Sequence, residues 1–76
     1  MPTTFETCVR SELDRARRRF PAHPSPEHGY AVLLAKMDEL KAELWKPHSE
    51  RSAIEILAEL VQIGAMAQRM AEDCLL

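Results

Sequence analysis

The sequence predicts an all-α fold, a three-helix chain with a central antiparallel helical hairpin that assembles into an oligomeric helical bundle. Apolar residues recur at steps of three and four, which is the period of an amphipathic helix. The alternating pattern of a strand is missing, and so is any internal repeat. The two glycines and five prolines lie mostly between the periodic segments. With 76 residues, the chain is predicted to form one domain over residues 1–76.

The first helix is predicted over about residues 4–20. Thr3-Thr4-Phe5-Glu6 has the pattern of a capping box, with a hydroxyl at the cap and Glu three residues later. Pro21 ends the segment. Its apolar stripe consists of Phe5, Cys8, Val9, Leu13, Ala16 and Phe20.

The second helix is predicted over about residues 27–45, with Ser25 as its cap and Pro26 at its first position. Lys46-Pro47-His48 ends it. Its apolar stripe consists of Tyr30, Leu33, Leu34, Met37, Leu40 and Leu44. We expect core packing for Tyr30 and an interfacial position for Trp45.

The third helix is predicted over about residues 50–73. Ser52-Ala53-Ile54-Glu55 is a second capping box, although Ser49 is an alternative cap one turn earlier. Its apolar residues cover about half of the helix circumference at 100° per residue, and an ordinary surface helix has a narrower stripe. We therefore expect this helix to pack on its own chain and on a second copy. The alternative to such an oligomer is a monomeric three-helix bundle.

Composition points in the same direction. A chain of this size buries only about 60% of its unfolded surface, so a homo-oligomer, a dimer or tetramer through the third helix, is the expected route to stability.

The net charge of −2 gives no general attraction to nucleic acid or lipid. No apolar run is long enough to span a membrane. Cys8 and Cys74 lack a disulfide framework and no secretory signal opens the chain, so we expect a cytoplasmic protein.

Carboxylates border the stripes of the second and third helices. Lys36, Glu39 and Glu43 share one flank of the second helix. Glu55, Glu59 and Gln62 share one flank of the third. A short connection favours antiparallel pairing, which lets these flanks face each other. Carboxylates one turn apart suit Mg²⁺ together with substrate phosphates, but charged flanks are also the ordinary solvated edges of helices.

From His28 to Asp73 the sequence resembles the MazG-type all-α nucleoside triphosphate pyrophosphohydrolases, especially the short bacterial and phage MazG-like proteins. Two stretches provide the likeness, which covers about 45 residues. They are His28-Gly29-Tyr30-Ala31-Val32-Leu33-Leu34-Ala35-Lys36-Met37-Asp38-Glu39-Leu40 and Ala58-Glu59-Leu60-Val61-Gln62-Ile63-Gly64-Ala65-Met66-Ala67-Gln68-Arg69. The resemblance implies a Mg²⁺-dependent hydrolysis of nucleoside triphosphates to monophosphate and pyrophosphate.

The family's metal site uses E-x-x-E on one helix and E-x-x-D on the next. Glu39 and Glu59 match one acid of each motif, while Lys36 and Gln62 stand where the other two acids belong. The resemblance therefore implies a degenerate metal site, and we expect Mg²⁺ binding to be weak. If chemistry survives, Glu43 and Glu55 are the substitutes, shifted by one turn.

Three functions are consistent with these residues. The first is a catalytically weak or inactive MazG-like protein that acts through nucleotide or protein binding. The second is an active Mg²⁺-dependent pyrophosphohydrolase, so the sequence leaves open whether the chain is an enzyme. The third is a small regulatory module that binds nucleic acid through the arginine-rich end of the first helix, where Arg17 and Arg18 are candidate phosphate ligands. The simpler reading of these arginines is that they complement the helix dipole, and we favour it.

Overall fold

The computed structural model describes residues 3–76 and confirms the all-α, three-helix prediction within them. Helix α1 spans Phe5–Arg19, α2 spans Pro26–Leu44 and α3 spans Ala53–Cys74. A short 3-10 helix, η1, spans His48–Glu50 in the connection between α2 and α3. Met1 and Pro2 were included in the predicted domain over residues 1–76 and lie outside the described residues.

Side-chain oxygens cap all three α-helices. Ser25 Oγ accepts from the His28 amide at 3.1 Å at the start of α2, as predicted. Ser52 Oγ accepts from the Glu55 amide at 3.3 Å at the start of α3, which is the serine half of the predicted capping box. The capping box of α1 lies one residue later than predicted. Thr4, which is still extended, is the cap, and its partner is Thr7 rather than Glu6. The predicted start of the third helix at about residue 50 is also early, because residues 48–50 form η1.

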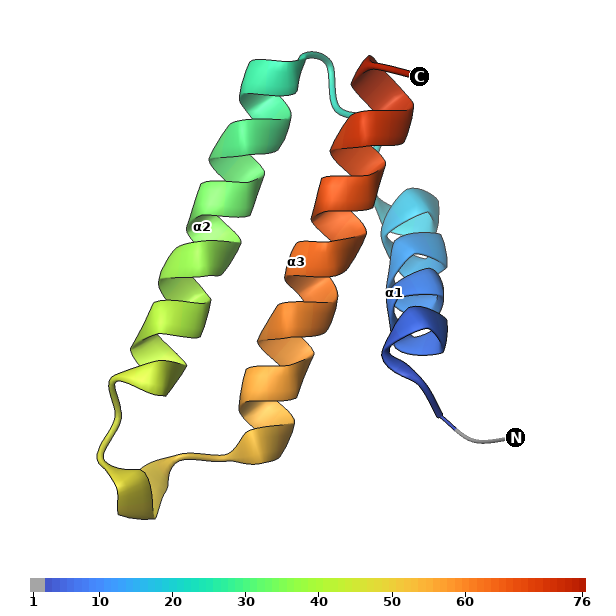
Figure 1. Cartoon of the computed structure of the whole chain (residues 1–76). Helices are drawn as coiled ribbons and strands as arrows, with labels where there is room; N and C mark the ends of the chain where they lie inside the picture. The colour runs from blue at the N-terminus through green and yellow to red at the C-terminus, as the bar shows by residue number, and fades with distance from the viewer. Residues whose placement is uncertain (1–2) are drawn as a thin grey trace.

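Helix α3 is the central element of the fold. Figure 1 shows α2 and α3 side by side, and α1 beside α3 on its other flank. Among the described residues, α3 packs along both other helices, whereas the backbones of α1 and α2 do not come close to each other. The three helices therefore form one layer with α3 in the middle. The principal extents of the chain are 41 × 33 × 19 Å. Within residues 3–76, no further helix covers either broad face of this layer.

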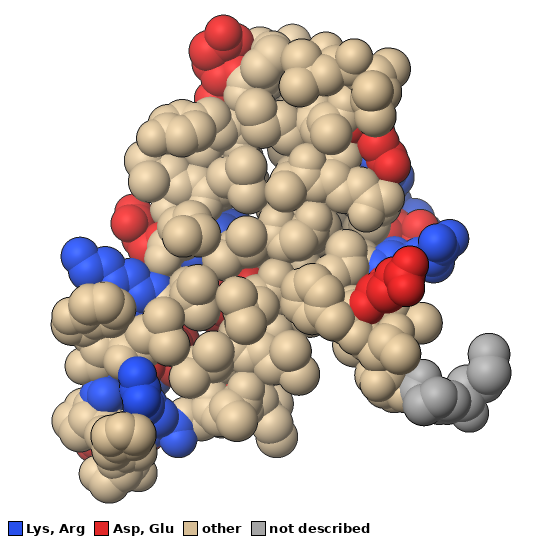
Figure 2. All heavy atoms as spheres, in the orientation of Figure 1, with Lys and Arg blue, Asp and Glu red and all other residues tan. Residues whose placement is uncertain are grey.

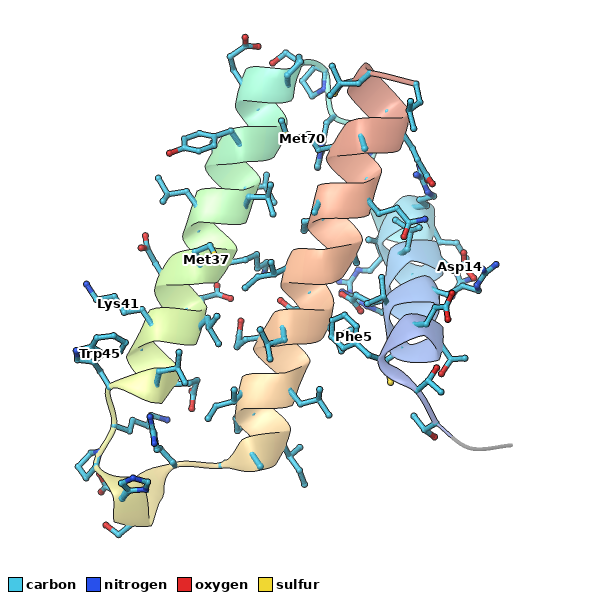
Figure 3. The ribbon with its side chains drawn as sticks, viewed as in Figure 1. Phe5, Asp14, Met37, Lys41, Trp45 and Met70 are labelled. Carbon is cyan, nitrogen blue, oxygen red and sulfur yellow. The ribbon has the colours of Figure 1, made fainter. Side chains whose placement is uncertain are left out.

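The buried core lies where α1 meets α3. It consists of Val9, Leu13, Ala16, Ala65 and Met66. Gly64 permits this close approach, since a Cβ atom there would lie 3.1 Å from Cγ2 of Val9 and 3.4 Å from Cζ of Phe5. Figure 3 shows Phe5 reaching from α1 toward α3. The first and last helices thus share the best-buried contacts of the chain.

The predicted apolar stripe of α2 divides into two parts. Leu33, Leu40 and Leu44 are half-buried. Tyr30 is 61% exposed, and Leu34 and Met37 are each 48% exposed. The expected core position of Tyr30 is wrong, because α1 lies along α3 rather than along α2 and leaves this side of α2 uncovered. Trp45 and Lys41 project from α2 away from α3 (Figure 3), with Lys41 Nζ 5.8 Å from the Trp45 ring centroid.

No helix within residues 3–76 combines the length and apolar character that crossing a membrane requires.

Candidate functional site

Lys36, Glu39 and Glu59 form a charged cluster between α2 and α3. Nζ of Lys36 lies 3.5 Å from Oε2 of Glu39, which is three residues later on the same helix. Glu59 on α3 interacts with both of these side chains and with Glu43. The cluster therefore brings one ammonium group and the carboxyl groups of two helices together.

Burial raises the pKa of Glu59 above its ordinary value of 4.5, and the nearby carboxyl group of Glu39 raises it further. Lys36 opposes this effect because its positive charge favours the ionised carboxylate. The net result is that Glu59 holds its proton to a higher pH than a solvated glutamate. Lys36 therefore compensates only part of the repulsion between the two carboxylates.

Two buried oxygen atoms in this region have no hydrogen-bond donor among the described residues. They are Oε2 of Glu59 and Oε1 of Gln62, one turn apart on α3. Oε2 of Glu43 also lacks a hydrogen bond, but it lies 3.1 Å from Nζ of Lys46 in an ion pair. Oxygens without donors are suited to a cation or to a donor group of a ligand.

The cluster is nevertheless a poor Mg²⁺ site. Within residues 3–76, no group of three or more His, Cys, Asp or Glu side chains is arranged to hold a metal ion. The ammonium group of Lys36 stands among the carboxyl groups and would repel a divalent cation. Glu43 lies near Glu59, whereas Glu55 is exposed in the first turn of α3. We therefore derive no catalytic step through a metal here.

A groove of about 710 Å³ lies beside this cluster. It is bounded by α1, α2 and the segment that joins them, and residues of α3 form its floor. Lys36 and Gln62 line it. Sequence reasoning missed the other polar residues of the groove, among them Glu12 and Arg15 on α1. Its apolar walls include Phe20, Val32 and Met66. The groove thus combines apolar surface with cationic side chains, a carboxylate and an amide.

Glu12 and Arg15 form a two-point ion pair at the edge of the groove. Arg15 donates from Nε to Oε2 of Glu12 at 2.8 Å and from Nη2 to Oε1 at 2.6 Å. These hydrogen bonds lower the pKa of Glu12, and the charge of Lys36 contributes to the same effect. The spacing of the two residues by three positions predicts such a pair, but only the packing of α1 on α3 directs it toward the groove.

A buried network fixes the segment between α1 and α2, which forms one end of the groove. Arg69, which is 3% exposed, donates from Nη2 to the carbonyl oxygens of Phe20, at 2.8 Å, and of Pro21. Asp73 accepts from the backbone amide of His23 at 3.0 Å and pairs with Arg69 at 3.5 Å. Cys74 completes the contact with a hydrogen bond from Sγ to the His23 carbonyl at 3.7 Å.

The structure uses Arg17 for this network as well. Its guanidinium donates to Asp73 at 2.8 Å and to Glu72 at 2.7 Å. Arg18 is exposed. Of the two candidate phosphate ligands, Arg17 therefore connects α1 to the end of α3, and neither lines the groove.

Comparisons of the chain with protein-family models, with curated proteins and with solved structures found no match.

Proposed function

We propose that the chain is a MazG-like helical protein in which Lys36 takes the place of a metal-binding acid, and that it binds a phosphate-bearing ligand, such as a nucleotide, without efficient hydrolysis. The observation behind this proposal is the ammonium group of Lys36, 3.5 Å from Glu39 and beside Glu59. The ammonium group supplies positive charge beside these carboxylates, which is the role that a bound metal ion has in a site made of acids alone.

The groove supports binding of a small anionic molecule. Lys36 supplies positive charge, and the amide of Gln62 can donate a hydrogen bond through its nitrogen to a phosphate oxygen. Arg15 also lines the groove, but its charge is balanced by Glu12. The walls at Val32, Met66 and Phe20 suit an apolar or aromatic group such as a nucleobase. The proposal includes an antiparallel hairpin of α2 and α3 as the unit of a homo-oligomeric bundle. A cytoplasmic location stays a prediction.

The degenerate-site part of the proposal is tested by calorimetric titration with Mg²⁺. We expect the unaltered chain to bind Mg²⁺ weakly, and Lys36→Glu combined with Gln62→Asp to bind it at least about tenfold more tightly, because both changes supply carboxylates. Lys41→Glu combined with Gln68→Asp makes the same charge changes on exposed positions of the same helices. An equal gain in both double variants, or none in either, would contradict the proposal.

Catalysis is tested by measuring pyrophosphate release from a panel of nucleoside triphosphates with Mg²⁺ or Mn²⁺. We expect little release. Rapid release that is lost in Glu59→Ala would instead establish the active pyrophosphohydrolase. Arg17 is already engaged by Glu72 and Asp73. We therefore favour nucleic-acid binding less than either nucleotide binding or pyrophosphohydrolysis.

Ligand binding in the groove is tested with the same nucleoside triphosphates by calorimetry without metal. Lys36→Met should weaken binding several-fold because it removes a cation from the groove. Lys46→Met removes an exposed lysine that does not line the groove and should leave binding unchanged. Equal affinities for both variants and the unaltered chain would show that the ligand binds elsewhere or not at all.

A further inference from the structure

The face of the helical layer opposite the groove has no partner among residues 3–76. Tyr30, Leu34 and Met37 recur along one stripe of α2. On α3, Leu57 and Leu60 are also exposed. Figure 2 shows that the face of α2 and α3 turned to the viewer is mostly uncharged at its centre, with charged side chains along its edges. We refer to these five residues as the apolar face.

The surface on this side of the layer is not flat. A hollow of about 630 Å³ lies between α1 and α3. Its lining combines apolar residues with the polar side chains of Glu6, Arg10, Asp14 and Gln68. Next to it, the exposed side chains of the apolar face stand on α2 and α3. Figure 3 shows Met37 on α2 and Phe5 at the hollow from this same side. Because the hollow carries charged side chains, the apolar face beside it is the surface better suited to contact a second copy.

The amount of exposed surface fits one interface. The chain exposes 5556 Å², whereas a compact monomer of its mass exposes only about 4,700 Å². The excess of roughly 800 Å² equals what one partner buries in a protein–protein interface of standard size. The radius of gyration of 13.4 Å likewise exceeds the value of about 11 Å expected for a compact chain of this length.

We infer that the apolar face packs against the apolar face of a second copy, forming a two-layer homodimer that leaves the groove open on the outside. A second layer is what a single layer of amphipathic helices lacks. A second copy suits a face with an uncharged centre, because two-fold packing then brings no like charges together there. This inference deepens the self-association in the proposed function and does not depend on nucleotide binding.

The first test is sedimentation of the unaltered chain from about 1 µM to about 100 µM. We expect the mass to approach twice 8.7 kDa as the concentration rises. A mass that stays at 8.7 kDa throughout overturns the inference and indicates a different partner for the face. Because this measurement uses no variant, it decides the question even if variants fail to fold.

The second test locates the interface. Leu60→Glu and Leu34→Glu should each raise the dimer dissociation constant by at least about tenfold, because each places a charge in an apolar contact. Ala58→Glu and Ala35→Glu are matched controls at exposed positions about 160° and 100° away around the same helices. Circular dichroism checks that each variant remains helical. If neither Leu60→Glu nor Leu34→Glu weakens the dimer, or if the control variants weaken it equally, the interface lies elsewhere. This result is independent of the nucleotide titrations.

Discussion

Arg17 on α1 donates a hydrogen bond of 2.8 Å from Nη1 to Oδ1 of Asp73, which lies 56 residues later in the last turn of α3. The Asp73 side chain is only 5% exposed. The same carboxylate accepts from the His23 amide and pairs with Arg69. Asp73 therefore joins α1, the following segment and α3 at one point.

Replacing Arg17 should destabilise the fold more than replacing its neighbour. Arg17→Ala removes hydrogen bonds to a buried carboxylate and should lower the free energy of unfolding by about 1–2 kcal/mol. Arg18→Ala removes an exposed arginine of the same helix and should change it by less than about 0.5 kcal/mol. Urea unfolding followed by circular dichroism measures both. Equal losses in the two variants would show that the contact to Asp73 contributes nothing.

Stability should fall as the pH drops below neutrality, and His23 should be one cause. Burial lowers the pKa of His23 below its ordinary value of 6.5, and the positive charge of Arg69 adds to this effect. Its contribution is therefore complete above pH 6.5 and is lost as the pH falls through the folded-state pKa.

His23→Gln, which cannot be protonated in this range, should flatten the decline. His48→Gln, at an exposed position in η1, should retain it. Thermal unfolding at a series of pH values measures the slopes, and a decline of the same steepness in His23→Gln would exclude His23 as its source. The lowered pKa of Asp73 adds a separate loss only at pH values near and below its ordinary value of 3.8.

Glu59 should have the opposite pH dependence. Its pKa is raised, so ionising it disfavours the folded state, and the chain loses stability as the pH rises through that pKa. Glu59→Gln removes this charge and should be more stable than the unaltered chain at pH 7, with the difference shrinking toward pH 4. Glu55→Gln is the control, since Glu55 is exposed on the same helix. Differential scanning calorimetry at pH 4 and pH 7 measures the stability difference between Glu59→Gln and the unaltered chain. The same difference at both pH values would show that titration of Glu59 does not affect stability.

Gly29 allows α2 to approach α3. A Cβ atom at this position would lie 2.7 Å from Cγ and 3.1 Å from Cβ of Met70. Gly29→Ala should therefore cost about 1 kcal/mol of stability through overpacking, despite the higher helix propensity of alanine. In a Met70→Ala background the same change should be neutral or stabilising. A double-mutant cycle by urea unfolding measures the difference, and purely additive effects would disprove the contact.

The helices could be predicted from sequence because their signals are local. Ser25, Pro26 and Ser52 determine helix starts through contacts within one turn, and those contacts form in the structure. At α1 the local signal was ambiguous between Thr3 and Thr4, since both are hydroxyl residues, and Thr7 supplied the partner expected from Glu6.

The arrangement of the helices was harder to predict because it depends on contacts distant in sequence. Nothing local indicates that α1 pairs with α3 alone, and for that reason Tyr30 was misassigned to the core. The proximity of Lys36, Glu39 and Glu59 followed from helical phase together with the pairing of α2 and α3. The groove and its Glu12–Arg15 pair could not be anticipated without the position of α1.

The location of the core also constrains when the chain can fold during synthesis. Val9, Leu13 and Ala16 come from α1, but their buried partners Ala65 and Met66 belong to α3. All of α2 is translated between these two groups, so the emerging chain has no means of completing its core until α3 has been made. Until then the apolar side of α1 lacks the α3 residues that bury it in the folded chain.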